Sequence, residues 1–151
     1  MMKEVKLKQI ESNKEKEIFI ELKLELVKLH QEYASKLGIF DQVVDKYDYR
    51  DAMRHFGEKG FFQFLIKMDW EIIGILEYQV TTSDIDNQKI VYIKKLYIKE
   101  GYQGKGYSRI VMEEVKKLGY RIELECWYEM PANDVYKALG MHQMKTRYIY
   151  K

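Results

Sequence analysis

Hydrophobic and polar positions follow two rhythms along the first part of the chain, one helical and one strand-like. Apolar residues recur every three or four positions over 14–37, which predicts an amphipathic helix, and Ser12 or Asn13 is placed to cap its start. Alternation over 3–11 predicts a strand before this helix. A shorter helix with less regular spacing is expected over 44–56.

The rest of the pattern predicts strands separated by turns and by two further helices. Apolar runs over 61–68 and 71–80 flank Asp69-Trp70, a two-residue connection that indicates a hairpin although it lacks glycine. The whole order, β-α-α-β-β-β-α-β-α-β, predicts an α+β fold. Its later elements are a strand over 90–98 after a polar turn at 84–88, a helix over 108–118, a strand over 121–128, a short helix from Pro131 to Gly140, and a last strand.

A glycine-rich segment connects the predicted strand 90–98 to the predicted helix 108–118. Glycine lets the backbone turn tightly and approach a ligand without interference from a Cβ atom. The free N–H groups and the positive dipole end at a helix start favour a phosphate group. The segment therefore predicts an anion site, and it reads Gly101-Tyr102-Gln103-Gly104-Lys105-Gly106-Tyr107-Ser108.

Two common phosphate loops do not fit this segment. A Walker loop requires Ser or Thr after its Gly-Lys pair, but Gly106 follows Gly104-Lys105 here. A dinucleotide-binding fingerprint requires a third glycine, where this chain has Arg109. Taken alone, the segment is equally compatible with a glycine-rich turn that binds no ligand.

The third pattern, Gln/Arg-x-x-Gly-x-Gly/Ala, fits the spacing of Gln103, Gly106 and Ser108. In this respect the segment resembles the acyl-CoA pyrophosphate loop of the GNAT superfamily of N-acetyltransferases. Ser108 replaces the usual Gly or Ala, but it is small enough for the same close approach.

Two further segments carry the same resemblance. Residues 136–141, Tyr-Lys-Ala-Leu-Gly-Met, are similar to the Tyr-x-x-x-Gly-Phe signature that ends the GNAT core, with Met141 in place of the aromatic residue. The run Leu96-Tyr97-Ile98 resembles the family's Leu-x-Val strand. The glycine loop and the 136–141 segment occur in the order that the family has, and together they are more specific than each one alone. The resemblance covers residues 61–150 well and the first 60 loosely.

The resemblance implies both a fold and an activity. The fold would be a single GNAT-like domain over residues 1–151, with a mixed, mostly antiparallel central sheet flanked by helices. The activity would be that of an N-acetyltransferase that takes acetyl-CoA as cosubstrate and needs no metal. Its acceptor would be a primary amine of a small molecule or a protein.

The resemblance also implies roles for individual residues. Backbone groups of Leu96-Tyr97-Ile98 would pair with the pantetheine arm and polarise the thioester carbonyl, and Tyr136 would protonate the departing thiolate as general acid. Lys105 or Arg109 could add a charged contact to a phosphate, with a solvated surface cation as the alternative for each. The loop expected to hold the pyrophosphate consists of Gln103, Gly104, Lys105, Gly106, Tyr107 and Ser108.

The general base is not evident. Related amine acetyltransferases often carry Glu just before the Leu-x-Val run, where this chain has Lys94 and Lys95. Glu77 and Glu125 are substitutes, each expected to be a surface or rim carboxylate, and a water chain to bulk solvent is the other route. The two lysines also suggest an acidic group on the acceptor, or simply a solvated strand edge.

Other polar residues are not expected to take part. The family often has Asn seven residues before the tyrosine, where this chain has Glu129, and Asn133 is out of register, so that contact with the pantetheine is in doubt. No metal is expected, because the three histidines lack the spacing of ligands: His30, His55 and His142.

Composition limits the classes of protein further. A length of 151 residues suits one domain, and a net charge of +2 with interleaved signs is not the footprint of a dedicated nucleic-acid binder. The single cysteine, Cys126, excludes an internal disulfide, is expected to be buried, and suits a reducing compartment, so we expect a cytoplasmic protein. Neither a membrane span nor a secretory signal is visible.

Three functional interpretations stay open at this stage. The first is an acetyltransferase that acts on an amine acceptor, without nucleic acid or membrane as partner and with a homodimer left open. The second is a non-catalytic acyl-CoA-binding or sensing domain, supported by the missing base and by Glu129 in place of the family's Asn. The third is an RNA-associated module, favoured only by the lysines and tyrosines.

Overall fold

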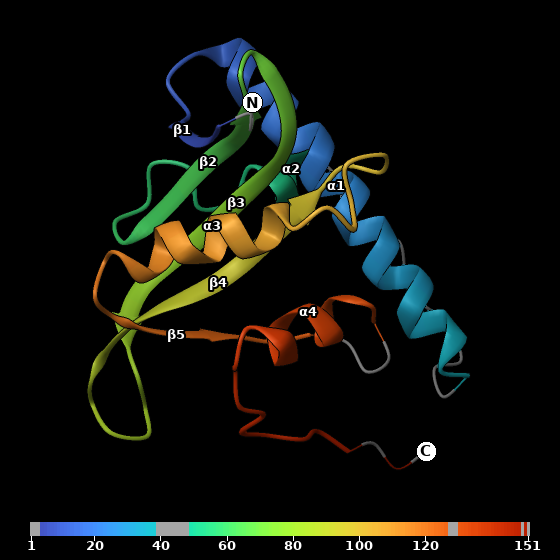
Figure 1. Ribbon diagram of the computed structural model, residues 1–151, viewed down its shortest axis with the longest axis vertical. Helices are drawn as coiled ribbons and strands as arrows, with labels where there is room; N and C mark the ends of the chain where they lie inside the picture. Colours follow the sequence, from blue (N-terminus) through green and yellow to red (C-terminus); the bar gives the residue numbers. More distant parts are fainter. Residues whose placement is uncertain (1–3, 39–48, 127–129, 149, 151) are drawn as a thin grey trace.

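A five-stranded sheet in the order β1-β2-β3-β4-β5 organises the chain in the computed structural model (Figure 1). The structure describes residues 4–38, 49–126, 130–148 and 150. In chain order the elements are β1 (Val5–Gln9), α1 (Asn13–Lys36), α2 (Tyr49–Ala52), β2 (Phe61–Met68), β3 (Glu71–Thr82), β4 (Lys89–Ile98), α3 (Tyr107–Lys116), β5 (Arg121–Leu124) and α4 (Ala132–Ala138).

The predicted α+β fold with a mixed, mostly antiparallel sheet is confirmed. Strands β1 to β4 pair antiparallel with their neighbours, and β5 pairs parallel with β4. The hairpin between β2 and β3 also forms where it was predicted. Asp69 takes a φ of +56° there, which lets a two-residue connection close without glycine.

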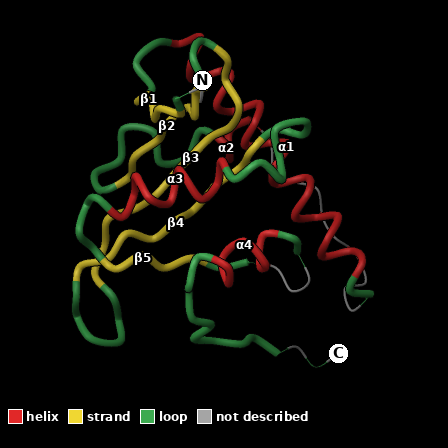
Figure 2. The backbone as a smooth tube through the Cα atoms, viewed as in Figure 1, coloured by secondary structure: helices red, strands yellow, loops and turns green. Residues whose placement is uncertain are grey.

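Helices cover both faces of the sheet, so two apolar layers form (Figure 2). Neighbouring residues on a strand point to opposite faces, and Leu65 and Ile66 therefore belong to different layers. The layer under α1 contains Phe19, Leu22, Leu65 and Ile75. The layer under α3 contains Ile66, Met68, Ile73, Leu76, Tyr78, Val91, Ile93, Ile98, Val111 and Val115.

Helix α1 begins at the predicted cap residue Ser12. The Ser12 hydroxyl accepts a hydrogen bond from the Glu15 backbone N–H at 3.1 Å, and the Glu15 carboxylate accepts one from the Ser12 N–H at 3.0 Å. This reciprocal arrangement satisfies two of the N–H groups that a helix start leaves free. None of the helices in the described residues is long and apolar enough to cross a membrane.

Three predicted elements differ from the structure. The second helix, expected over 44–56, is the four-residue α2; residues 44–48 lie outside the described part, and the chain leaves the helix before His55, whose φ is +79°. The strand expected over 121–128 ends at Leu124, and residues 127–129 are not among those described.

The last predicted strand does not form in residues 141–148. In Figure 1 this segment runs below α4 and apart from the sheet. Met144 and Tyr148 are 61% and 89% exposed, so the segment buries little apolar surface that would hold it against another strand. The sheet edge that it would extend, β5, has only four residues.

Candidate active site

The sheet opens between β4 and β5. Their parallel ladder pairs 90–93 with 121–124, and β4 then continues to Ile98 with β3 as its partner on the other side. Among the described residues, no strand pairs with the β5-facing edge of 94–98. Because half of the backbone groups of an extended strand point to each side, this edge can hydrogen-bond a ligand that lies along it.

Two features of β3 and β4 shape this opening. The register shifts between Glu77 and Tyr78, so that Lys94 is an extra residue on β4, and such a bulge bends a strand. Further along, a Cβ atom on Gly74 would overlap the Tyr97 carbonyl oxygen. The close approach of β4 to β3 beside the opening therefore requires glycine at position 74.

The loop after β4 turns through left-handed glycines. Gly101, Gly104 and Gly106 have φ angles of +94°, +76° and +84°. Gly106 is the N-cap of α3 and offers no side-chain cap, and the first helical bond described runs from the Ile110 N–H to the Gly106 carbonyl at 3.3 Å. The N–H groups of the first turn therefore remain available to a ligand.

The space next to the loop glycines Gly104 and Gly106 is not filled by other atoms. An added Cβ on Gly104 or Gly106 would meet no atom within 4 Å. A pocket of about 100 Å³ lies here, at the junction of β4, the loop and the helices α3 and α4. Its lining consists of Ile98, Tyr102, Gln103, Gly104, Gly106, Tyr107, Ser108, Arg109 and Val135.

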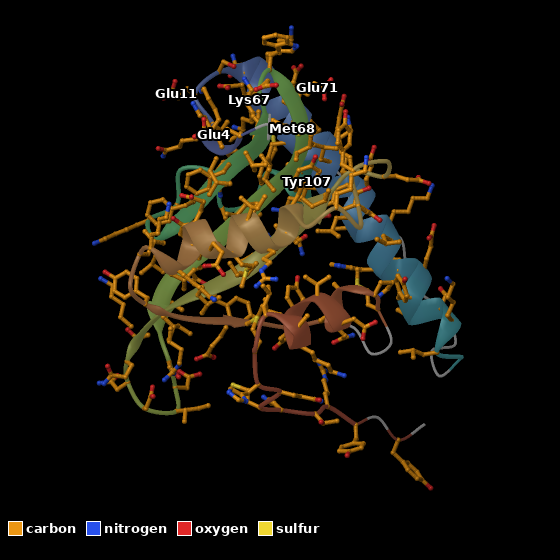
Figure 3. All side chains as sticks on the ribbon, viewed as in Figure 1. Glu4, Glu11, Lys67, Met68, Glu71 and Tyr107 are labelled. Carbon is orange, nitrogen blue, oxygen red and sulfur yellow. The ribbon has the colours of Figure 1, made fainter. Side chains whose placement is uncertain are left out.

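Two side chains stabilise the conformation of the loop through hydrogen bonds within the protein. The Gln103 side-chain amide donates to the Ile98 carbonyl at 2.7 Å, which ties the loop to the end of β4. The Tyr107 hydroxyl donates to the Met68 sulfur at 3.1 Å and anchors the start of α3 on β2 (Figure 3). Both residues line the pocket, but the Gln103 amide nitrogen and the Tyr107 hydroxyl already bond within the protein, so backbone N–H groups are the main donors that the loop offers a ligand.

The predicted cofactor residues thus divide into two groups. The pocket brings together Ile98, Gln103, Gly104, Gly106, Tyr107 and Ser108, whereas Leu96, Tyr97 and Lys105 do not line it. Leu96 and Ile98 pack toward α3, while Tyr97 faces α1 and donates its hydroxyl to Glu25 at 3.2 Å. Burial, reinforced by Glu25, raises the pKa of Tyr97 to about 12.

Tyr136 lies on α4, next to the pocket residue Val135, and is partly buried. Burial raises the pKa of Tyr136 to about 12, with a smaller contribution from Cys126. The phenol therefore carries its proton throughout the neutral range. Cys126 is partly buried, and burial raises the pKa of its thiol, so it is a thiol rather than a nucleophilic thiolate.

The two candidate bases lie in different surroundings. Glu77 is 1% exposed, so its prediction as a surface or rim carboxylate is wrong. Its carboxylate forms an ion pair with the Lys23 ammonium at 3.0 Å and accepts from the Gln63 amide at 3.1 Å. Glu125 is exposed, as predicted for a rim carboxylate. Glu129 lies outside the described residues, and the Asn133 amide donates to the nearby Met130 carbonyl at 3.0 Å.

The buried pair was missed although the sequence carries a signal for it. Lys23 shares the apolar stripe of α1 with Phe19 and Leu26, and Glu77 stands two residues after Ile75 on the face of β3 that α1 covers. A charged residue in an apolar stripe points to a buried partner of opposite charge. No group of three metal-ligating side chains gathers in the described ranges.

Comparison with models of protein families assigns the chain to a family. The model of the acetyltransferase (GNAT) family matches residues 25–141, and the chain belongs to this family. Comparison with curated protein sequences gives no match.

Solved structures show the same fold at low sequence identity. The YycN protein of Bacillus subtilis has a TM-score of 0.72 and 14% identity, with 98% of each chain covered. AAC(6')-Iy, in complex with the bisubstrate analog CoA-S-monomethyl-acetylneamine, has a TM-score of 0.68 and 13% identity, covering 98% of this chain and 97% of that one. The aminoglycoside acetyltransferase meta-AAC0020 from an uncultured soil metagenomic sample, in complex with sisomicin, has a TM-score of 0.64 and 14% identity, with coverage of 97% and 95%.

Proposed function

We propose that this GNAT protein transfers the acetyl group of acetyl-CoA to a primary amine, and that it does so in the cytoplasm. The observation that carries the proposal is the continuity of three features: the unpaired edge of β4, the open glycine loop at the start of α3, and α4, whose Val135 lines the same pocket. A small-molecule acceptor is favoured, because AAC(6')-Iy and meta-AAC0020 are recorded with an acetylneamine analog and with sisomicin.

The residues present fit acetyl-CoA in their chemistry. Backbone N–H groups of the loop 103–108 and the dipole of α3 would hold the pyrophosphate, and Arg109 on the pocket wall would add a charge-assisted contact. The free edge of 94–98 would accept the pantetheine arm as a further strand. An N–H group near the end of β4 would then stabilise the oxygen on which negative charge develops.

The reaction requires one bond to form and one to break. The neutral amine nitrogen attacks the thioester carbonyl carbon, and the C–N bond forms as the carbonyl electron pair moves to oxygen. When that pair returns, the C–S bond breaks and the sulfur leaves with its electrons. Tyr136 donates its proton to the sulfur and recovers one from solvent, while the attacking nitrogen loses a proton. The products are an N-acetylated amine and CoA with a free thiol.

Deprotonation of the amine is assigned to water. Glu77 is fully engaged by Lys23 and Gln63, so an amine cannot reach it without breaking a buried ion pair. Glu125 is exposed to solvent and does not line the pocket. A chain of water molecules needs no dedicated residue and only requires that some of the acceptor be neutral.

A panel of amines with acetyl-CoA tests the proposal, with release of the CoA thiol as the readout. We expect thiol release that depends on the amine and gives a product of one added acetyl group by mass spectrometry. The main alternative is an acyl-CoA-binding or sensing domain without catalysis. It would give a CoA-dependent rise in melting temperature but no thiol release with any amine.

A further inference from the structure

A polar cluster under α1 takes no part in the acetyl transfer described above. Gln63, Glu77 and Lys95 stand side by side on β2, β3 and β4, since Gln63 is paired with Glu77 and Glu77 with Lys95. They share the sheet face that α1 covers, and Lys23 reaches them from α1. Three of the four are almost completely buried, with exposures of 7% for Gln63, 1% for Glu77 and 2% for Lys23.

The negative charge of Glu77 is already neutralised by a partner within this cluster. One carboxylate oxygen pairs with the Lys23 ammonium at 3.0 Å, and the other accepts from the Gln63 amide at 3.1 Å and from Lys23 at 3.2 Å. Lys23 also donates to the Ala52 carbonyl at 3.3 Å. One buried carboxylate therefore balances one buried ammonium.

Lys95 is left as a second, partly buried cation. Its side-chain ammonium makes no hydrogen bond or ion pair with any residue that the structure describes. Its pKa is lowered, first by burial and then by Lys23; Glu77 opposes this, and Lys94 adds a smaller lowering. The neighbouring His30 is no counter-ion: burial, with Lys95 nearby, lowers its pKa to about 4, so its ring is neutral at pH 7.

The position of Lys95 relates this cation to the proposed acceptor. It lies on β4 two residues before Tyr97, within the stretch that has lost its β5 partner. Lys95 and Tyr97 face α1, whereas the glycine loop and its pocket adjoin α3 on the other face. With acetyl-CoA on the α3 side, an acceptor that approaches β4 from the α1 side would meet Lys95 beside the thioester.

We infer that the acceptor amine carries an anionic group, a carboxylate or a phosphate, which pairs with the ammonium of Lys95. This rests on the proposed function and specifies the class of its substrate. An anion placed here would complete a set of two cations and two anions, with Lys23 held by Glu77 and Lys95 held by the substrate. A charge-assisted hydrogen bond in such a partly desolvated place is stronger than one in water.

Matched pairs of amines test the inference. The panel compares β-alanine with β-alaninamide, and O-phosphoethanolamine with ethanolamine, so that each pair differs in the anionic group. We expect kcat/KM to be at least about tenfold higher for the anionic member of one pair, and that pair identifies carboxylate or phosphate. Equal values within both pairs, or preference for the neutral members, would overturn the inference.

Variants assign the effect to Lys95. Lys95→Met should raise KM for the anionic amine by about 10- to 100-fold and leave the neutral one within about threefold, and Lys95→Arg should recover part of the loss. Lys89→Met is the control, because Lys89 is an exposed lysine at the other end of β4 and lies over the Tyr120 ring at 5.6 Å, so its exchange should leave both KM values unchanged. An equal loss for both members of a pair would reduce Lys95 to a structural residue.

A binding measurement separates failure of this inference from failure of the proposed function. If acetyl-CoA raises the melting temperature but no amine is acetylated, the same pairs are titrated calorimetrically into the CoA-loaded protein. Tighter binding of the anionic amine, lost in Lys95→Met, supports the inference without turnover, and equal binding overturns it. If acetyl-CoA has no effect on melting, the proposed function fails, and titration of the free protein decides on Lys95 by the same comparison.

Discussion

Tyr136 is the residue whose side chain is most directly assigned to bond breaking. Tyr136→Phe removes only a hydroxyl from a partly buried ring, so packing and acetyl-CoA affinity should survive. Turnover should fall by about 10²-fold or more, the usual size of general acid catalysis. Steady-state kinetics with the best amine measures this, with Tyr148→Phe, at a position 89% exposed, as the control. Unchanged turnover would leave Tyr136 as a packing residue and thiolate protonation to water.

Glu77 illustrates a residue whose removal should affect stability more than chemistry. Glu77→Gln leaves the Lys23 ammonium buried without a counter-charge, which should cost about 3–5 kcal/mol in the free energy of unfolding. Turnover per folded molecule should change by less than about tenfold, because Glu77 is not the base. The double variant Lys23→Met with Glu77→Leu should recover most of the stability in denaturant titrations. A large loss of turnover in a fully folded Glu77→Gln protein would contradict this assignment.

His30 should make the fold less stable in acid. Its pKa is lowered from 6.5 to about 4 in the folded chain, so between these pH values the unfolded chain binds more protons and stability falls as pH falls. The loss grows progressively as pH falls from about 6.5 toward 4, and it is absent well above pH 6.5. Melting curves from pH 7 to pH 4 measure it. His30→Gln should flatten the curve, whereas exchange of the exposed His142 should not.

At the scale of elements, the sequence predicted what periodicity and local chemistry determine. The hairpin strands 61–68 and 71–80, the strand at 90–98 and the capped helix after Ser12 are all confirmed, because each has a continuous pattern or a local cap. The glycine loop could also be located, since its turns depend on glycines that are close together in the sequence. The contacts between distant elements depend instead on strand order and pairing, which no local pattern contains.

Contacts between distant elements could not be predicted in this way. The ion pair of Lys23 with Glu77 joins residues 54 positions apart. The extra residue at Lys94 is visible only in the pairing of β3 with β4, and it determines that Lys95 stands beside Glu77. The short α2 and the strand that does not form after Gly140 have the same origin, because tertiary contacts rather than propensity decide weakly patterned segments.

The helix α3 offers a matched pair of glycines for testing the loop. Gly106 and Gly119 stand at its two ends with φ angles of +84° and +79°, and neither Cβ position has an atom within 4 Å. Gly106→Val and Gly119→Val should therefore both lose about 1–3 kcal/mol through backbone strain. Acetyl-CoA at a hundredfold excess over its dissociation constant should stabilise the wild type and Gly119→Val by roughly 3 kcal/mol.

Only Gly106→Val should lose this stabilisation, because its side chain would occupy the open space above the loop. Thermal melting with and without acetyl-CoA gives the answer for all three proteins. A shift of equal size in Gly106→Val and Gly119→Val would move the cofactor site away from the loop. The absence of a shift in the wild type would remove the basis of the acetyltransferase proposal.

At the scale of the whole molecule, the proposed function places the cofactor and the acceptor on opposite sides of one sheet. In the proposed binding mode the cofactor contacts lie toward α3 and are mostly backbone groups, so they depend little on side-chain identity, in keeping with a fold shared with AAC(6')-Iy at 13% identity. The α1 side carries the charged side chains. Among them is Lys95, close to the position on β4 where related amine acetyltransferases often have a glutamate. Differences in acceptor are therefore expected to reside in side chains such as Lys95, while the cofactor geometry is a property of the fold.

The pH dependence of the reaction tests whether water, rather than a protein base, deprotonates the amine. With Glu77 locked in its ion pair and Glu125 exposed, the neutral fraction of the amine should set the rate, and kcat/KM should rise with pH toward the pKa of the amine itself. The pKa of Tyr136, about 12, keeps its proton in place, so the rate should not fall at the alkaline end of the practical range. Two amines of different pKa should give profiles displaced by that difference. An acidic limb near pH 6–7 (about the pKa of a positioned base) that is the same for both amines and vanishes in Glu125→Gln or Glu77→Gln would instead identify a protein base.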